Sequence, residues 1–174
     1  MEDLSKILSD PENLEGNNLE EVVKIIHNLA PEHADFILWQ GLNIKITKND
    51  LIRDRFFQRK YLEAAREAVQ IYNEEVQNVS ASTKDGCSLM DDCFKKEKTA
   101  LIDLTEKKTE SEQNIDLGQQ FLSKGIITGF RNPALGHASI TKLLNDNTFT
   151  DRNCLDILST ISYLFNRLEK RIKP

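Results

Sequence analysis

The sequence predicts an all-α protein, a helical bundle with an additional N-terminal helical segment. Apolar residues recur at the three- and four-residue spacing of an α-helix in several long stretches. Residue types that cap helix N-termini precede most of these stretches. The 174 residues include only seven glycines and four prolines, which leaves room for long uninterrupted helices.

The composition is that of an ordinary globular protein with one substantial core, at 39% hydrophobic and 29% charged residues. The three cysteines are odd in number and form no CxxC pair, which predicts reduced thiols. No apolar run approaches membrane-spanning length, and the first residues are acidic, unlike a secretory signal. We therefore expect a cytoplasmic protein that does not associate with membranes.

The negative charge is concentrated at one end of the chain. Residues 1–50 carry ten acidic and four basic side chains, a net charge of −6, whereas residues 51–174 carry eighteen and nineteen, a net charge of +1. We divide the chain accordingly into an acidic N-terminal helical extension, 1–50, and a helical domain, 51–174.

The extension contains two predicted helices. A capping-box pattern at 18–21 begins the first, which we expect to end at Pro31. Residues 32–40 predict a second, short helix that packs through Trp39. Residues 42–47 alternate apolar and polar side chains, which indicates a short strand or an extended linker.

The longest helical tract is predicted at 51–78, after a cap signal at 47–50. Its apolar face comprises Phe56 or Phe57, Tyr61, Ala65, Ala68, Val69, Tyr72 and Val76. A polar loop is expected at 80–86 and a short core helix at 87–94. Residues 95–113, rich in Lys, Glu and Thr, indicate an exposed connection.

Two further helices complete the predicted bundle. The first covers 115–130, with Leu117, Phe121, Ile126 and Ile127 as its apolar residues. The last follows a cap signal at 148–151, and its apolar stripe comprises Cys154, Leu155, Ile157, Leu158, Ile161, Leu164, Phe165 and Leu168.

The most concentrated chemistry lies in the segment 129–137, between these two helices. Asn132 precedes a proline, which predicts that the arriving helix ends or bends there. Arg131 is a permanent cation whose fork of donors suits phosphate, and His137 exchanges protons near neutral pH. An arginine and a histidine without a carboxylate cluster favour phosphodiester cleavage without a metal.

The surroundings of this segment permit contact with RNA. The stretch from 120 to 145 has three basic residues and no acidic one, so Lys124 and Lys142 are candidate substrate-binding residues beside Arg131. The three histidines show no metal-ligand spacing, and we expect neither metal nor cofactor. The alternative is structural, because Arg-Asn-Pro commonly ends a helix and a lone loop histidine is usually only solvated.

Three segments in order carry a family resemblance: Phe57 with Tyr61-Leu-Glu-Ala-Ala-Arg-Glu-Ala68, Asp85-Gly86 with Leu89-Met90 and Phe94, and Gly125 with Gly129-Phe-Arg-Asn-Pro133 and His137. With the closing apolar helix, they resemble the Ymh-type family of uncharacterised prokaryotic proteins. That family in turn resembles the HEPN superfamily of Arg-x(4–6)-His helical domains; here five residues separate Arg131 from His137.

The resemblance implies a HEPN-like helical bundle that forms a homodimer with a composite active site. It implies a metal-independent endoribonuclease of a phage-defence or toxin–antitoxin system, with RNA as substrate and an antitoxin or defence-complex protein as a further partner. Arg131, Asn132 and His137 are then the catalytic residues. The alternative is a non-catalytic HEPN-like interaction or RNA-binding module, which leaves open whether the protein is an enzyme.

Overall fold

The computed structural model describes residue 39, residues 41–131 and residues 148–172. The chain divides into two compact units, Met1–Gly41 and Leu42–Pro174. In the first unit, Trp39 is buried. The helices predicted before residue 39 lie outside the described residues, and the fold below is that of the second unit.

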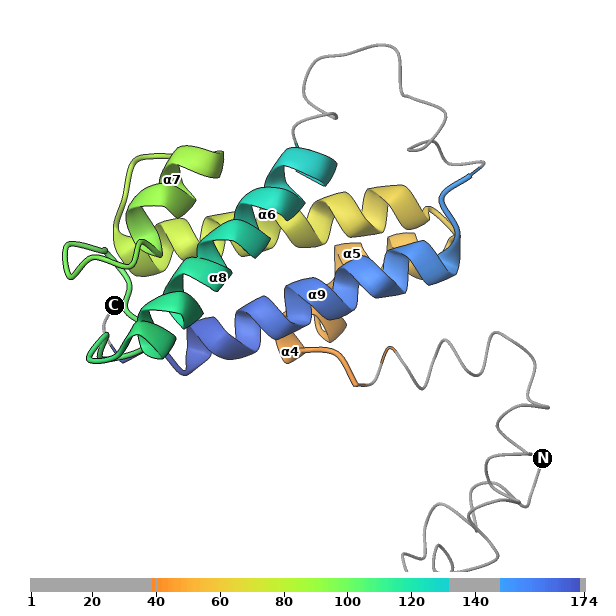
Figure 1. The fold of residues 1–174 in the computed structure, drawn as a ribbon. Helices are drawn as coiled ribbons and strands as arrows, with labels where there is room; N and C mark the ends of the chain where they lie inside the picture. The colour runs from red at the N-terminus through yellow and green to blue at the C-terminus, as the bar shows by residue number, and fades with distance from the viewer. Residues whose placement is uncertain (1–38, 40, 132–147, 173–174) are drawn as a thin grey trace, which may run out of the picture. The chain divides into compact units, whose positions relative to one another are not determined.

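Within the described part of the chain, every regular element is a helix, which confirms the all-α prediction (Figure 1). The elements are α4 (Ile44–Thr47), α5 (Asp50–Phe57), α6 (Tyr61–Ser80), α7 (Gly86–Cys93), α8 (Glu110–Ile126), the π-helical turn η2 (Ile127–Arg131) and α9 (Asp151–Glu169). None of these helices is long and apolar enough to cross a membrane.

The centre of the bundle is the pair α6 and α9, which lie side by side in Figure 1. The rings of Tyr72 and Phe165 meet edge to face, with 5.3 Å between their centroids. Fully buried alanines on α6 allow close approach, and the Cys154 thiol reaches the backbone of Ala65. The predicted stripe of α9 is confirmed as its core face, except that Ile157 is only partly buried.

The predicted strand or linker at 42–47 is wrong, because most of this segment is α4. The Asn43 side chain accepts a hydrogen bond from the backbone of Lys45 and so caps the helix. The Asn43 backbone N–H donates to Ser162 Oγ on α9 at 2.7 Å, and Ile46 is fully buried. These tertiary contacts select a helical turn where alternation alone favoured a strand.

The single helix predicted at 51–78 is also wrong, because it is interrupted between α5 and α6. Arg59 adopts a left-handed conformation with φ of 62°, and the N–H of Lys60 donates to the carbonyl of Arg55 at 2.8 Å. This is the Schellman pattern that ends many helices, usually with glycine at the left-handed position. The chain has arginine there, so the usual sequence signal is missing.

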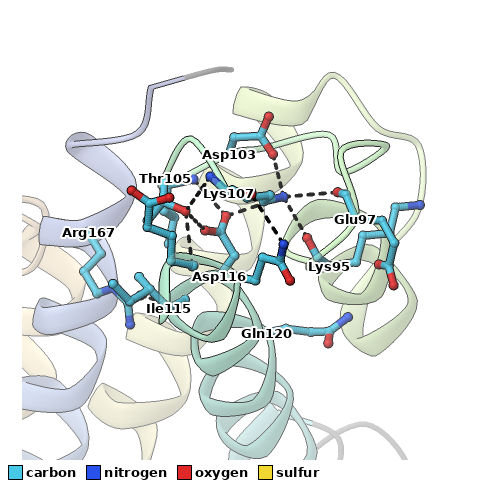
Figure 2. Close-up of polar contacts among 12 residues, drawn as sticks. Lys95, Glu97, Asp103, Thr105, Lys107, Ile115, Asp116, Gln120 and Arg167 are labelled. Atoms are coloured by element: carbon cyan, nitrogen blue, oxygen red, sulfur yellow. Dashed lines mark hydrogen bonds and ion pairs between the residues drawn. The ribbon is translucent and has the colours of Figure 1, made fainter. Parts of the chain in front are cut away.

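The connection predicted to be exposed at 95–113 is exposed only in part. Lys107 has a side chain that is only 2% exposed, and its Nζ lies 2.6 Å from Asp103 Oδ1 and donates to the carbonyl of Lys95 at 2.8 Å (Figure 2). The fully buried Asp116 of α8 accepts hydrogen bonds from the backbone N–H of Leu104 and from Thr105 Oγ1. A buried ionic network therefore fastens the connection to α8.

Helix α8 begins earlier than predicted, and only part of its predicted apolar face is buried. It begins at Glu110 after a capping box formed by Thr109 and Glu112. Its buried side chains are mostly polar, namely Asp116, Gln119, Gln120, Ser123 and Ile126. The predicted core residue Phe121 is 62% exposed, whereas Ile126 and Ile127 are buried as predicted. Gln119 and Ser123 bond to Tyr72, so polar contacts determine which face of α8 is inside.

Candidate functional site

The candidate site begins where α8 changes from α-helix to the π-helical turn η2. Ile127, the first residue of η2, is fully buried, and Arg131 is the last residue. A π-helical turn rotates the following side chains relative to a continuous α-helix, and such turns are frequent at functional sites. The turn brings Arg131 toward α6 and the start of α7.

The guanidinium of Arg131 is held by two other elements. Its Nε donates to Oε1 of Gln70 on α6 at 2.8 Å, and its Nη2 donates to Oδ2 of Asp85 at 2.5 Å. The Arg131 side chain is 14% exposed, whereas that of Asp85 is 51% exposed. The cation therefore has a fixed orientation at the edge of the protein.

Asn73 supports the carboxylate that holds Arg131. Its Nδ2 donates to Asp85 Oδ1 at 2.7 Å, and its Oδ1 accepts from the backbone N–H of Gly86 at 3.1 Å. Asn73 is 1% exposed, so both ends of a buried carboxamide are used to fix the turn that begins α7. We call Gln70, Asn73, Asp85, Gly86 and Arg131 together the Arg131 cluster.

Gly86 is required in this cluster for two reasons. Its φ of +61° lies in the left-handed region that side chains disfavour. A Cβ built on Gly86 would also stand 3.3 Å from Arg131 Nη1, closer than most Cβ contacts. The guanidinium thus packs directly over the backbone of Gly86.

The environment of Asp85 keeps its carboxylate charged. Partial burial by itself raises the pKa of Asp85, but hydrogen bonds from Arg131 and Asn73, with the arginine charge, hold that pKa below its usual value. The pair is therefore ionic throughout the neutral range.

Lys124, a predicted substrate-binding residue, also bonds to a carboxylate of α7. Its Nζ donates to Asp91 Oδ1 at 2.6 Å, and Gln120 donates to the same oxygen at 3.1 Å. The positive charge of the stretch 120–145 is therefore partly neutralised in the folded protein, because Asp85 pairs with Arg131 and Asp91 pairs with Lys124.

The other predicted site residues, Asn132, His137 and Lys142, lie outside the described residues. The structure therefore places Arg131 and Lys124 alone among the predicted set, each beside a carboxylate near α7. Sequence reasoning did not assign a site role to Gln70, Asn73 or Asp85. Asp85 and Gly86 end the polar loop predicted at 80–86, and Gln70 and Asn73 are polar residues three positions apart in the predicted long helix. Only the tertiary structure joins these residues to Arg131.

Two of the three cysteines, Cys93 and Cys154, are buried and offer little nucleophilic chemistry. All three thiols are free. Burial raises the pKa of Cys93 to about 11 and that of Cys154 to about 12, so both stay protonated and unreactive. In the described ranges, no group of three or more His, Cys, Asp or Glu side chains is arranged to hold a metal ion.

Comparison with protein-family models gives a match over residues 45–168, to a family described as "Protein of unknown function (Hypoth_ymh)". Among the described elements, the match includes α5 to η2 completely, α9 up to Leu168, and the whole Arg131 cluster. Comparison with curated proteins and with solved structures gave no match.

Proposed function

Since the chain belongs to the Hypoth_Ymh family, whose description assigns no activity, we propose a function from the site itself. The protein is a metal-independent endoribonuclease of the HEPN type, acting in a phage-defence or toxin–antitoxin system. Its catalytic residues are Arg131, Asn132 and His137, and Lys124 and Lys142 help to bind the RNA backbone.

The observation that carries this proposal is the fixed orientation of Arg131. A guanidinium bonded to both Gln70 and Asp85 has lost most of its rotational freedom before any substrate arrives. Donors that are oriented in advance stabilise developing charge better than donors that must reorganise. Such an arginine, directly before Asn132 in the sequence, is suited to the oxygens of a phosphodiester.

The reaction uses a nucleophile that RNA itself supplies. His137 takes the proton of the 2′-hydroxyl, whose oxygen attacks phosphorus while the bond from phosphorus to the 5′-oxygen breaks. The leaving 5′-oxygen receives a proton, and the products are a 2′,3′-cyclic phosphate and a 5′-hydroxyl. Arg131 neutralises the charge that grows on the non-bridging oxygens, and Asn132 orients the histidine or the phosphate.

A homodimer would supply a second imidazole, so that one histidine acts as base and the other as acid. The outer face of α8 supports this assembly, because Ile115, Phe121 and Leu122 are exposed by 45%, 62% and 44%. A Cβ added at Gly118 or Gly125 would meet nothing within 4 Å in the described structure. Glycine within a helix costs about 1 kcal/mol relative to alanine, and close approach of a second copy would explain that cost.

The test is incubation of purified protein with single-stranded and hairpin RNA in the presence of EDTA. Cleavage by the wild type and its loss in His137→Ala are expected. Activity that chelation removes, or that His137→Ala retains, would contradict the proposal. The variant's melting temperature separates a catalytic loss from unfolding.

A second candidate function is a non-catalytic interaction or RNA-binding module, and the ion pair itself favours it. Arg131 is only 14% exposed and pairs with Asp85, as a purely structural arginine would. This candidate predicts that Arg131→Ala lowers the melting temperature strongly and that no RNA is cleaved under any condition.

A further inference from the structure

Asp85 stands at the N-cap position of α7, where an aspartate side chain normally accepts a hydrogen bond from the first turn of the helix, but Asp85 does not do so. A capping side chain is worth about 0.5–2 kcal/mol of helix stability. Both carboxylate oxygens are instead used elsewhere, Oδ1 by Asn73 and Oδ2 by Arg131.

The hydrogen bonds within the Arg131 cluster form a chain from Asn73 through Asp85 to Arg131. The buried carboxamide of Asn73 fixes both Asp85 and the backbone of Gly86, and Asp85 then accepts from Arg131. Gln70, one turn before Asn73 on α6, fixes the Nε–H of Arg131. Two residues of one α6 face thus determine where the guanidinium lies, one directly and one through Asp85.

Resting on the proposed ribonuclease activity, we propose that Asp85, held by Asn73, is a positioning residue that acts through Arg131 on the phosphodiester of an RNA substrate. The described residues take up the Nε–H and one N–H of Nη2. Nη1 donates to none of the described residues, so the guanidinium keeps N–H donors for phosphate oxygens.

The proposal explains why an acidic residue lies next to a group meant for an anion. The carboxylate lowers the net charge of the site, which weakens ground-state binding of RNA. In return it holds the guanidinium in one orientation, and a misplacement of about 1 Å can reduce a rate about 100-fold. Loss of Asp85 should therefore reduce kcat more than it changes KM.

The experiment compares Asp85→Asn and Asp85→Ala with the wild type on a defined hairpin RNA. Asp85→Ala should lower kcat about 10–100-fold, with KM unchanged or lower. Asp85→Asn keeps a hydrogen-bond acceptor of the same size and should retain part of kcat. Asp92→Asn is the matched control, since Asp92 is an α7 carboxylate that pairs with Lys84 and should keep wild-type kcat.

A second readout is independent of catalysis. In the ¹H–¹⁵N spectrum, the Nε–H resonance of Arg131, assigned by its loss in Arg131→Lys, should be sharp and protected from exchange in the wild type. It should broaden or shift in Asp85→Ala and stay unchanged in Asp92→Asn. This measurement reports the orientation of the side chain whether or not RNA is cleaved.

The outcomes separate the two proposals. An Asp85→Ala variant with the kcat of the wild type would overturn the positioning role. The role would also be overturned if kcat fell only in proportion to the folded fraction of the variant while the Nε–H resonance of Arg131 stayed unchanged. A wild type that cleaves no RNA would overturn the ribonuclease proposal, and the catalytic purpose of Asp85 with it. If the Nε–H resonance of Arg131 still changes in Asp85→Ala, the Arg131 cluster would then orient Arg131 for ligand binding without catalysis.

Discussion

The hydroxyl of Tyr72 on α6 lies 2.8 Å from the hydroxyl of Ser123 on α8, in the interior of the bundle. Gln119 donates to the same tyrosine oxygen at 2.9 Å and to the carbonyl of Leu164 on α9 at 3.2 Å. Burial raises the pKa of Tyr72 well above its usual value, so the hydroxyl remains protonated. This buried network joins α6, α8 and α9.

Removing the Tyr72 hydroxyl should destabilise the bundle. Tyr72→Phe leaves the Ser123 hydroxyl and an N–H of Gln119 buried without this partner, which costs about 1–3 kcal/mol. Urea denaturation of both proteins measures the difference. Tyr163→Phe is the control on the 52% exposed tyrosine of α9, with an expected change within about 0.5 kcal/mol. Equal effects of the two variants would show that the network contributes nothing specific.

Lys107 should be the most sensitive residue of the connection before α8. Lys107→Met removes the cation from beside Asp103 and Asp116, and breaking a buried ion pair from one side costs about 3–5 kcal/mol. Thermal and urea denaturation measure the loss. The neighbouring Lys108 forms an exposed pair with Glu106, so Lys108→Met should leave the melting temperature unchanged. A stable Lys107→Met protein would contradict the structural importance of the network.

The contrast between α9 and α8 shows what a single sequence can reveal. The stripe of α9 is apolar and periodic, and Thr150 with Asn153 forms its capping box, so burial and pattern agree. In α8 the buried positions other than Ile126 are polar and Phe121 is exposed, so the same rule found little of the buried face. That face depends on hydrogen bonds to Tyr72 and Leu164, more than forty positions away in the chain, which no local pattern reveals.

The candidate site, like the fold, could be predicted from the sequence only in part. Arg131 could be found because an arginine, a carboxamide and an imidazole stand close together in the sequence, at 131, 132 and 137. Asp85 and Asn73 could not be given their roles, because they join Arg131 only after α6, α7 and η2 pack together. Arg59 likewise ends α5 in a left-handed conformation that glycine would have signalled.

The outer face of α8 should hold the proposed dimer together. Phe121→Glu places a charge on that face and should raise the dimer Kd about 30-fold or more, as for an interface residue worth about 2 kcal/mol. Analytical ultracentrifugation measures the Kd. Phe57→Glu, at a 51% exposed phenylalanine of α5, should leave it unchanged. A wild-type monomer at all concentrations, or a Phe121→Glu dimer of wild-type affinity, would contradict an interface through α8.

The ion pair of Asp85 and Arg131 should make stability depend on pH in acid. The pKa of Asp85 is lower in the folded protein than its usual unfolded value of about 3.9, so the pair contributes stability above that value. The contribution is lost as the pH falls through the folded pKa. The difference in unfolding free energy between wild type and Asp85→Asn should thus shrink between about pH 5 and pH 2. A difference that stays constant over this range would show that the charge of Asp85 does not stabilise the fold.

The chemistry of the RNA ends tests the central proposal most directly. The wild type, in EDTA, should convert a 5′-labelled RNA into fragments that end in a 2′,3′-cyclic phosphate, and the matching fragments should begin with a 5′-hydroxyl. Replacing the 2′-hydroxyl at the cleavage site by hydrogen should abolish the reaction, and Arg131→Ala should do so without loss of the dimer. Fragments that carry a 3′-hydroxyl and a 5′-phosphate would contradict the proposed mechanism, and intact RNA under all conditions would leave the bundle as a binding module.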